Sequence, residues 1–279
     1  MTIDGHTELI PLIGYPTFTF KSPLIYNPYF DHAGINARVV PMGCQPEHFE
    51  ALVRSLLTLT NLRGLLITMP HKVSTVALLD EASPAVRVAG ACNAVRRAPD
   101  GRLVGDLFDG TGFVRSLRLK GLVLRGARVL VVGCGGVGSA IAAALAAEGI
   151  TSLTLHDVSN RTAARLADRL TTVFPGLNVQ VGSNDPAGLD LVVNASPLGM
   201  HDNDPLPVDV NRLQPATWVG EVVMRGRLTP LLAAAQARGC PVQVGTDMLF
   251  EQIPDYLAFF GLPVTDAAQL RALAQLEPA

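Results

Sequence analysis

Residues 128–138, R-V-L-V-V-G-C-G-G-V-G, decide the fold of this chain. The first five, Arg128 to Val132, contain the apolar run V-L-V-V, which is rich in β-branched valine and typical of a strand buried on both faces. Six residues with the spacing G-x-G-x-x-G follow at once, and the alanine-rich stretch from Ser139 to Glu148 then predicts a helix that ends at Gly149. A strand, a glycine turn and a helix in this order predict a dinucleotide-binding unit, with a purely structural turn as the alternative.

The glycines of this turn have a physical reason to lie at a pyrophosphate. They permit a tight turn and a close approach of the backbone, and the N-terminus of the following helix offers unpaired N–H groups to an anion. The candidate cofactor-binding residues of the turn are Gly133, Gly135, Gly136, Val137 and Gly138.

The choice between NAD and NADP depends on Asp157 and Arg161. Asp157 ends the next predicted strand and lies 24 positions after Gly133, close to the spacing of about 20 that is typical of the ribose-binding acid. A carboxylate there can accept hydrogen bonds from both ribose hydroxyls of NAD, and it would repel a 2′-phosphate of charge about −1.5 to −2. Arg161 could instead pair with that phosphate, or be an exposed charge at the start of a helix. The sequence therefore favours NAD, with NADP as the alternative.

Apolar runs alternate with helical patterns on both sides of the glycine turn, which predicts parallel α/β sheets. The predicted strands before the turn are Glu8 to Gly14, Ala37 to Pro41 and Gly64 to Thr68, and a helix is expected over Pro46 to Leu59. The others are Ser152 to His156, Val179 to Val181, Leu189 to Asn194, Trp218 to Val223 and Val242 to Gly245. We expect two α/β domains, residues 1–115 and 116–246, with a helical segment of residues 247–279 that returns to the first.

Composition excludes several classes of protein. Hydrophobic residues make up 48% and charged residues 16% of the 279 residues, so the chain can bury a large core and is not disordered. A net charge of −2 with dispersed Lys and Arg indicates neither a nucleic-acid nor a membrane partner. No secretory signal or membrane-length apolar run is visible, so we expect a cytoplasmic protein.

Cysteine and histidine spacing predicts no metal site. The four cysteines lie far apart without a CxxC pair, and the six histidines show no HxxxH or HxH spacing. We therefore expect four reduced thiols rather than a disulfide framework.

Several separated motifs resemble one family of dehydrogenases. They are GYP at 14–16 with KSP at 21–23, TMPHK at 68–72, GACNA at 90–94, GDLFDG at 105–110, NASPLGM at 194–200, TPLL at 229–232 and MLFEQ at 248–252. In this order they are similar to the motifs of the shikimate and quinate dehydrogenase family, whose T-x-P-x-K segment carries a lysine and whose G-D-N-T-D-G segment carries its aspartate partner. The resemblance extends over nearly the whole chain.

The resemblance implies a function and a set of site residues. It implies an N-terminal substrate domain and a Rossmann domain with the active site in the cleft between them, and an NAD(P)-dependent oxidoreductase that acts on shikimate, quinate or a related hydroxylated ring acid. Lys72 and Asp109 would be the catalytic pair. Ser22, Thr68, Asn93 and Gln252 would contact the ring acid, with Phe20 in the same loop, and Asn194, Ser196, Pro197, Met200 and Val222 would border the cofactor.

The chemistry explains why such a pair is needed. Oxidation of an alcohol removes the hydroxyl proton as hydride leaves, and a lysine beside a carboxylate can move that proton, which is typically worth about 10²–10⁴-fold in rate. Taken singly, Lys72 could be a solvated surface lysine and Asp109 a helix N-cap. Their contact is implied by the resemblance alone.

Three residues depart from the family pattern. Phe20 stands where a serine is usual, Leu66 where an asparagine is usual, and Met224 where a tyrosine is expected. A lost hydrogen bond to a charged carboxylate costs about 1.5–3 kcal/mol, or about 10- to 150-fold in binding. Two alternatives therefore stay open: the same fold and cofactor with a less polar substrate, or a non-catalytic ligand-sensing homologue. The sequence also leaves open a homodimer, and a role in aromatic amino acid biosynthesis or in catabolism.

Overall fold

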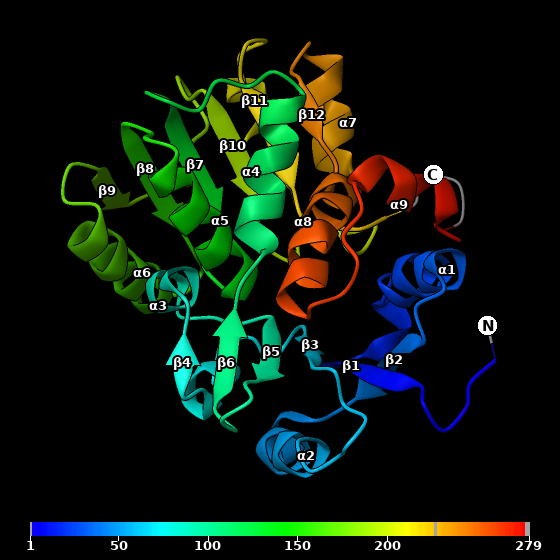
Figure 1. Cartoon of the computed structure of the whole chain (residues 1–279). Helices are drawn as coiled ribbons and strands as arrows, with labels where there is room; N and C mark the ends of the chain where they lie inside the picture. The colour runs from blue at the N-terminus through cyan, green and yellow to red at the C-terminus, as the bar shows by residue number, and fades with distance from the viewer. Residues whose placement is uncertain (1, 226–227, 277–279) are drawn as a thin grey trace. The chain divides into compact units, whose positions relative to one another are not determined.

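The computed structural model describes residues 2–225 and 228–276, which fall into two compact units. One unit contains the described residues up to Phe108 and those from Gln252 onward, and the other spans Asp109–Glu251. The divisions lie a few residues from the predicted edges at 115 and 247. Within the described residues each unit has its own six-stranded sheet, so the α/β fold class is confirmed (Figure 1).

The sheet of the first unit is mixed, which corrects the expectation of a parallel sheet. Its strands are β1 (Glu8–Gly14), β2 (Ala37–Gly43), β3 (Leu65–Ile67), β4 (Glu81–Ala82), β5 (Ala94–Arg97) and β6 (Leu103–Asp106), in the order β2-β1-β3-β5-β6-β4. β5 is antiparallel to both β3 and β6. The reason is the short connection between β5 and β6, where Ala98 N–H donates to the Arg102 carbonyl; only a long crossover would allow a parallel pair.

Three helices of the first unit, those that start at Pro23, Pro84 and Ala267, begin at a proline or after a capping side chain. They are α1 (Pro23–Ala33), α2 (Phe49–Leu56), α3 (Pro84–Ala89) and α9 (Ala267–Leu273), with 3-10 turns η1 (Thr17–Thr19), η2 (Pro46–His48) and η3 (Ser74–Leu78). The helix expected over 46–59 is thus divided into η2 and α2. Ser83 caps α3 by accepting a hydrogen bond from Val86 N–H at 3.3 Å.

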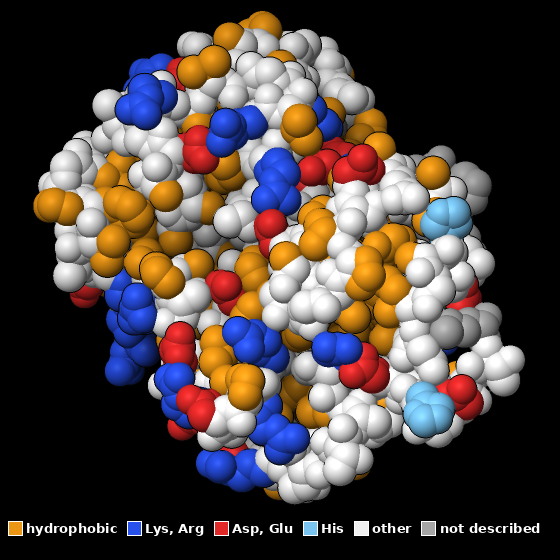
Figure 2. All heavy atoms as spheres, in the orientation of Figure 1, with side chains coloured by type: hydrophobic (Ala, Val, Ile, Leu, Met, Phe, Trp, Pro, Cys, Tyr) orange, Lys and Arg blue, Asp and Glu red, His pale blue; other side chains and the backbone are white. Residues whose placement is uncertain are grey.

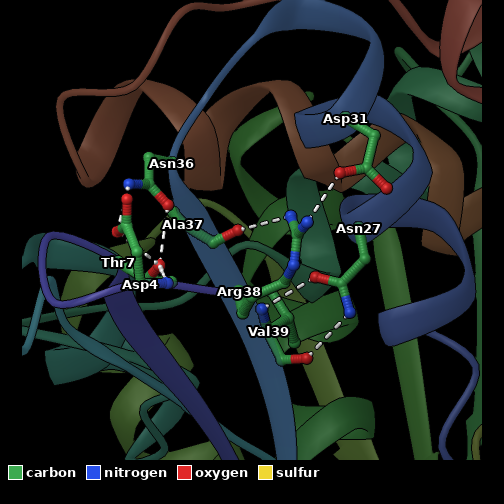
Figure 3. Close-up of polar contacts among 8 residues, drawn as sticks. All are labelled: Asp4, Thr7, Asn27, Asp31, Asn36, Ala37, Arg38 and Val39. Atoms are coloured by element: carbon green, nitrogen blue, oxygen red, sulfur yellow. Dashed lines mark hydrogen bonds and ion pairs between the residues drawn. The ribbon is translucent and has the colours of Figure 1, made fainter. Parts of the chain in front are cut away.

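The outer strand β2 is protected by side chains of α1 (Figure 3). Asn27 accepts a hydrogen bond from the Val39 N–H at 2.9 Å and donates one to the Val39 carbonyl at 3.0 Å. Arg38 donates to the Ala37 carbonyl at 2.9 Å and to Asp31 at 2.6 Å. These contacts satisfy backbone groups that an open edge would offer to another chain.

The sheet of the second unit is wholly parallel, as predicted for a dinucleotide-binding domain. Its strands are β7 (Arg128–Val132), β8 (Ser152–His156), β9 (Asn178–Val181), β10 (Leu191–Asn194), β11 (Trp218–Glu221) and β12 (Val242–Gln243). They lie in the order β12-β11-β10-β7-β8-β9, as Figure 1 shows. The order reverses between β7 and β10, and ligands of such sheets bind at the carboxyl ends of the strands at this switch point.

Helices cover both faces of this sheet. They are α4 (Asp109–Leu119), α5 (Gly136–Ala147), α6 (Asn160–Val173), α7 (Pro230–Ala237) and the first part of α8 (Gly245–Phe259), with the 3-10 turn η4 (Val210–Arg212). α4 and α5 lie on the same face (Figure 1), and a Cβ on Gly110 would collide with the backbone of Ala140. α8 continues into the first unit, where the predicted C-terminal helical return lies.

Surface and thiol properties of the described residues complete the fold. On the face drawn in Figure 2, Lys and Arg side chains are interspersed with Asp and Glu. The four cysteines are buried free thiols. Among residues 2–225 and 228–276 no three His, Cys, Asp or Glu side chains are grouped as a metal site, and no helix there has the length and apolarity to cross a membrane.

Candidate active site

The glycine turn of the second unit, residues 133–138, excludes side chains at two positions, Gly133 and Gly138. Gly133 follows β7 with φ of 95°, a left-handed conformation that favours glycine. A Cβ on Gly138 would collide with the carbonyl oxygen of Gly133, and Ser139 Oγ donates to the Cys134 carbonyl at 3.1 Å. By contrast, a Cβ on Gly135 would meet no protein atom within 4 Å. The turn therefore presents open backbone at the N-terminus of α5, which fits a dinucleotide pyrophosphate.

Asp157 lies directly beside this turn. Its Oδ2 accepts a hydrogen bond from the Cys134 N–H at 2.7 Å, and its Oδ1 accepts one from the Ser159 N–H at 2.8 Å. Val158 is fully exposed, and Arg161 is exposed in the first turn of α6. The structure thus places a carboxylate at the end of β8 next to the glycine turn, as the spacing predicted.

The loop after β10 is shaped by the buried side chain of Asn194. Asn194 Nδ2 donates to the Leu198 carbonyl at 2.8 Å, and its Oδ1 accepts from Ser196 N–H at 3.1 Å and Ser196 Oγ at 2.6 Å. Pro197 and Met200 are exposed, and Val222 N–H donates to the Asn194 carbonyl at 3.2 Å. These predicted cofactor-binding residues therefore lie together at the carboxyl ends of β10 and β11.

In the first unit, backbone hydrogen bonds join the segments that carry the predicted site residues Thr68, Lys72 and Asn93. The Asn93 carbonyl accepts from Ile67 N–H at 2.8 Å, and the Lys72 carbonyl accepts from Cys92 N–H at 2.8 Å. Lys72 is 8% exposed, which rules out a solvated surface lysine. The segments that carry these three residues are therefore adjacent.

Two of the predicted substrate residues present buried polar atoms without a partner. Asn93 Oδ1 accepts a hydrogen bond from Phe108 N–H at 3.1 Å, but its Nδ2 has no partner among the described residues. Gln252 Oε1 is also buried without a partner there. Because unpaired buried polar atoms are rare and costly, such atoms are candidates for ligand contacts.

The loop before α1 places an aromatic ring beside Thr68. Gly14 is flanked by the Thr68 methyl group and by the Phe20 ring tip, whose Cζ would lie 3.0 Å from a Cβ on Gly14. Ser22 precedes α1, and its carbonyl accepts from Tyr26 N–H at 2.9 Å. Leu66 is buried in β3. Phe20 therefore lines the same part of the first unit as Thr68.

Comparison with known proteins decides the family. The family model of the shikimate dehydrogenase substrate binding domain matches residues 12–95. The chain is 39% identical over 285 aligned residues to a shikimate dehydrogenase (NADP(+)) of Rubrobacter xylanophilus, and the match covers 98% of this chain and 97% of that protein. The chain belongs to the shikimate dehydrogenase family. The resemblance that the motifs predicted is confirmed, as is the assignment to nicotinamide-dependent oxidoreductases.

Solved structures of the family share the fold over almost the whole chain. Shikimate 5-dehydrogenase from Listeria monocytogenes, in complex with shikimate and NAD, has a TM-score of 0.88 at 26% identity, and the match covers 98% of each chain. Quinate dehydrogenase from Corynebacterium glutamicum, in complex with NAD, has a TM-score of 0.84 at 31% identity, with 96% of this chain and 98% of that one covered. A nicotinamide dinucleotide is therefore the class of cofactor, but the NADP(+) in the name of the Rubrobacter relative favours NADP over the predicted NAD.

The family's proposed catalytic pair is divided between the two units. Lys72 follows β3 in the first unit, and Asp109 is the buried first residue of α4 in the second. Met224, at the position of the expected tyrosine, is half-buried in the second unit. The pairing of Lys72 with Asp109 stays a prediction.

Sequence reasoning missed two buried groups next to predicted site residues. The His71 ring stacks on Phe49 with centroids 4.1 Å apart, and its Nε2 lies 2.9 Å from the Cys44 carbonyl oxygen. These two contacts fix the residue that directly precedes Lys72. Glu221 is buried beside Asn194 at the end of β11. Neither has a local signal, because the partners come from distant parts of the chain.

Proposed function

We propose that this chain catalyses reversible hydride transfer between a nicotinamide dinucleotide and shikimate, quinate or a related hydroxylated ring acid. The observation that carries the proposal is the buried lysine Lys72 in a segment adjacent to Asn93, whose Nδ2 is buried and unpaired. A buried lysine amino group and an amide with an unpaired Nδ2 are suited to contact the oxygen atoms of a polar substrate.

In the proposed mechanism, the first unit binds the acid and moves its proton. When bound, the dinucleotide supplies the hydride acceptor, and the turn at 133–138 with Asp157 would hold it. Lys72, with Asp109 as its proposed partner, takes the proton from the substrate hydroxyl as the neutral amine during oxidation, and as the resulting ammonium it returns that proton to the oxygen during reduction. Ser22, Thr68, Asn93 and Gln252 orient the ring.

Initial rates with purified protein test this function. Shikimate and quinate are each assayed with NAD and with NADP. Rapid turnover of either acid with either cofactor supports the proposal. Tight cofactor binding without turnover of either acid favours a related ring acid as the substrate. No turnover of any hydroxylated ring acid contradicts the proposal and favours a ligand-sensing homologue.

For the cofactor we propose NAD, although the names of the curated relatives favour NADP. The support is local: both Asp157 oxygens are held by backbone N–H groups beside the glycine turn, and the neighbouring Val158 offers no positive charge to a 2′-phosphate. A fixed carboxylate accepts hydrogen bonds from ribose hydroxyls and repels a phosphate.

Replacement of Asp157 by asparagine should lower kcat/KM for NAD by about 10- to 150-fold, because charge-assisted hydrogen bonds to ribose are worth about 1.5–3 kcal/mol. NADP kinetics should stay the same or improve. Steady-state kinetics with both cofactors check this, and Asp168→Asn, an exposed acid on α6, is the matched control. A wild-type enzyme that prefers NADP, and that loses this preference in Arg161→Ala, would show that Arg161 governs the choice.

A less polar substrate is the second candidate, favoured by the Phe20 ring beside Gly14 and Thr68. Phe20→Ser should then raise kcat/KM for shikimate or quinate by about 10-fold or more, the value of one hydrogen bond to a charged carboxylate. Phe18→Ser is the matched control, since Phe18 lies two residues away and is 85% exposed. If wild type already turns over shikimate rapidly and Phe20→Ser is slower, the ring is part of a normal shikimate pocket.

A further inference from the structure

Glu221 is an acidic residue at a position where burial is costly. It is the last residue of β11, is 1% exposed, and lies opposite Asn194, the last residue of β10. A buried carboxyl is normally fully hydrogen-bonded or paired with a cation. Glu221 Oε2, however, has no hydrogen-bond partner among the described residues.

The other contacts of this carboxyl join two segments of the second unit. The side chains of Thr229 and Asn194 hydrogen-bond to Glu221 and lower its pKa, but burial outweighs them and raises the pKa to about 7. Thr229 is the N-cap of α7 and accepts a hydrogen bond from Leu232 N–H at 3.3 Å. Glu221 therefore connects the loop after β10 to the start of α7.

The same loop is held at a second point. Arg225 donates to the Gly199 carbonyl at 3.3 Å and forms an ion pair with Asp202 at 2.6 Å. A Cβ on Gly199 would lie 3.7 Å from Thr229. The loop of residues 194–200 is thus packed against the segment that contains Thr229, and Glu221 hydrogen-bonds to a residue of each.

We infer that Glu221 is a positioning residue whose carboxyl, by joining Asn194 to Thr229, holds the loop of residues 194–200 in the conformation that receives the nicotinamide half of the cofactor. The inference rests on the proposed function, which places this loop at the cofactor. Glu221 itself makes no proposed contact with the substrate or the reacting atoms.

The charge on Glu221 should then affect cofactor binding near neutral pH. The cation that acts on it is Arg225. The segment that follows the loop carries His201, Asp202 and Asp204, and Asp204 accepts from the Gly199 and His201 N–H groups at 2.9 Å. With a pKa raised to about 7, the carboxyl is neutral at pH 6 and charged at pH 8. The charged form leaves a buried oxygen unpaired and can draw Arg225 from Gly199, so cofactor affinity should fall as pH rises through about 7.

Stability should follow the same sign. The pKa in the folded state is above the unfolded value of about 4.3, so the folded state binds more protons in this window. The contribution of Glu221 to the free energy of unfolding is fully present below the unfolded-state pKa of about 4.3. It is lost as pH rises through the folded-state pKa of about 7. Glu221→Gln, which stays neutral, should remove this part of the pH dependence.

Fluorescence titration of NADH and NADPH from pH 5.5 to 8.5 tests the inference without requiring turnover. For the preferred cofactor, the wild-type Kd should rise several-fold across pH 7, and the Glu221→Gln profile should be flat. Glu221→Ala should raise the Kd by about tenfold, as expected for loss of about 1.4 kcal/mol of positioning hydrogen bonds. In steady-state kinetics its cofactor KM should rise, with the KM for the ring acid unchanged.

Gln243→Ala is the matched control, because Gln243 is also fully buried at a strand end of this unit with an unpaired oxygen. It should lower the thermal midpoint without changing the cofactor Kd. If Glu221→Ala behaves like this control, or if the wild-type pH dependence persists in Glu221→Gln, the inference is overturned. Should Glu221→Ala fail to fold, the isosteric Glu221→Gln profile decides. Wild type that binds cofactor with this pH profile but turns over no ring acid would overturn the proposed function alone.

Discussion

Replacement of Lys72 by alanine should lower kcat for the ring acid by about 10²–10⁴-fold, the range that general acid–base catalysis supplies. Dinucleotide affinity should be unchanged, since Lys72 belongs to the first unit and the glycine turn to the second. Stopped assays at high enzyme concentration measure the residual rate, and NADH or NADPH fluorescence measures binding.

Two further variants make the Lys72 result specific. Lys21→Ala removes another lysine of the same unit, next to Ser22 in the predicted substrate loop but without a proposed role in proton transfer, and should keep most of the rate. Asp109→Asn should reproduce a large part of the Lys72 defect if the two residues act as a pair. Near-normal turnover in Lys72→Ala would refute its role in proton transfer.

Replacement of Gly135 by valine should separate binding from folding. A side chain at this position meets no protein atom within 4 Å, and its backbone is in an extended conformation that valine adopts readily. The valine would instead occupy the space through which a pyrophosphate approaches the N-terminus of α5. Loss of one or more hydrogen bonds to this charged group, about 1.5–3 kcal/mol each, should raise the dinucleotide Kd by about 10- to 150-fold or more.

The thermal midpoint of Gly135→Val should stay close to that of wild type, which distinguishes a loss of cofactor binding from a loss of folding. Gly138→Val should both unfold the turn and abolish binding, because a Cβ at Gly138 collides with the Gly133 carbonyl. Gly176→Val, in a loop of the same unit with open space around it, is the control for substitution of glycine by a branched side chain. Unchanged cofactor affinity in Gly135→Val would mean that the turn is only structural.

The second unit could be predicted almost strand by strand, whereas in the first unit β1, β2 and β3 were predicted and β4, β5 and β6 were not. The predicted strands of residues 128–132 and 152–156 coincide with β7 and β8. In a parallel sheet both faces are buried, so each strand is visible as a continuous apolar run. β5 and β6 have half-buried or exposed residues and a short connection, and their antiparallel pairing depends on partners that are distant or poorly marked in the sequence.

The candidate site shows the same difference. Motif order indicated the family and named the turn, Asp157 and the loop from Asn194, because those segments are short and contiguous. Other features of the site depend on residues that are distant in the sequence. They are the burial of Lys72, the unpaired Nδ2 of Asn93 and the stacking of His71 on Phe49.

The sequence by itself determined the strand, glycine turn and helix at residues 128–148, since turn geometry and apolar periodicity are local properties of the chain. The sequence also determined that a carboxylate, Asp157, follows the next strand, β8. Only the tertiary structure decided that Glu221 is a buried acid with a pKa raised to about 7, and that a phenylalanine ring lies beside Thr68. Desolvation and packing arise from what surrounds a side chain, and those surroundings are assembled from segments that the chain brings together only when it folds.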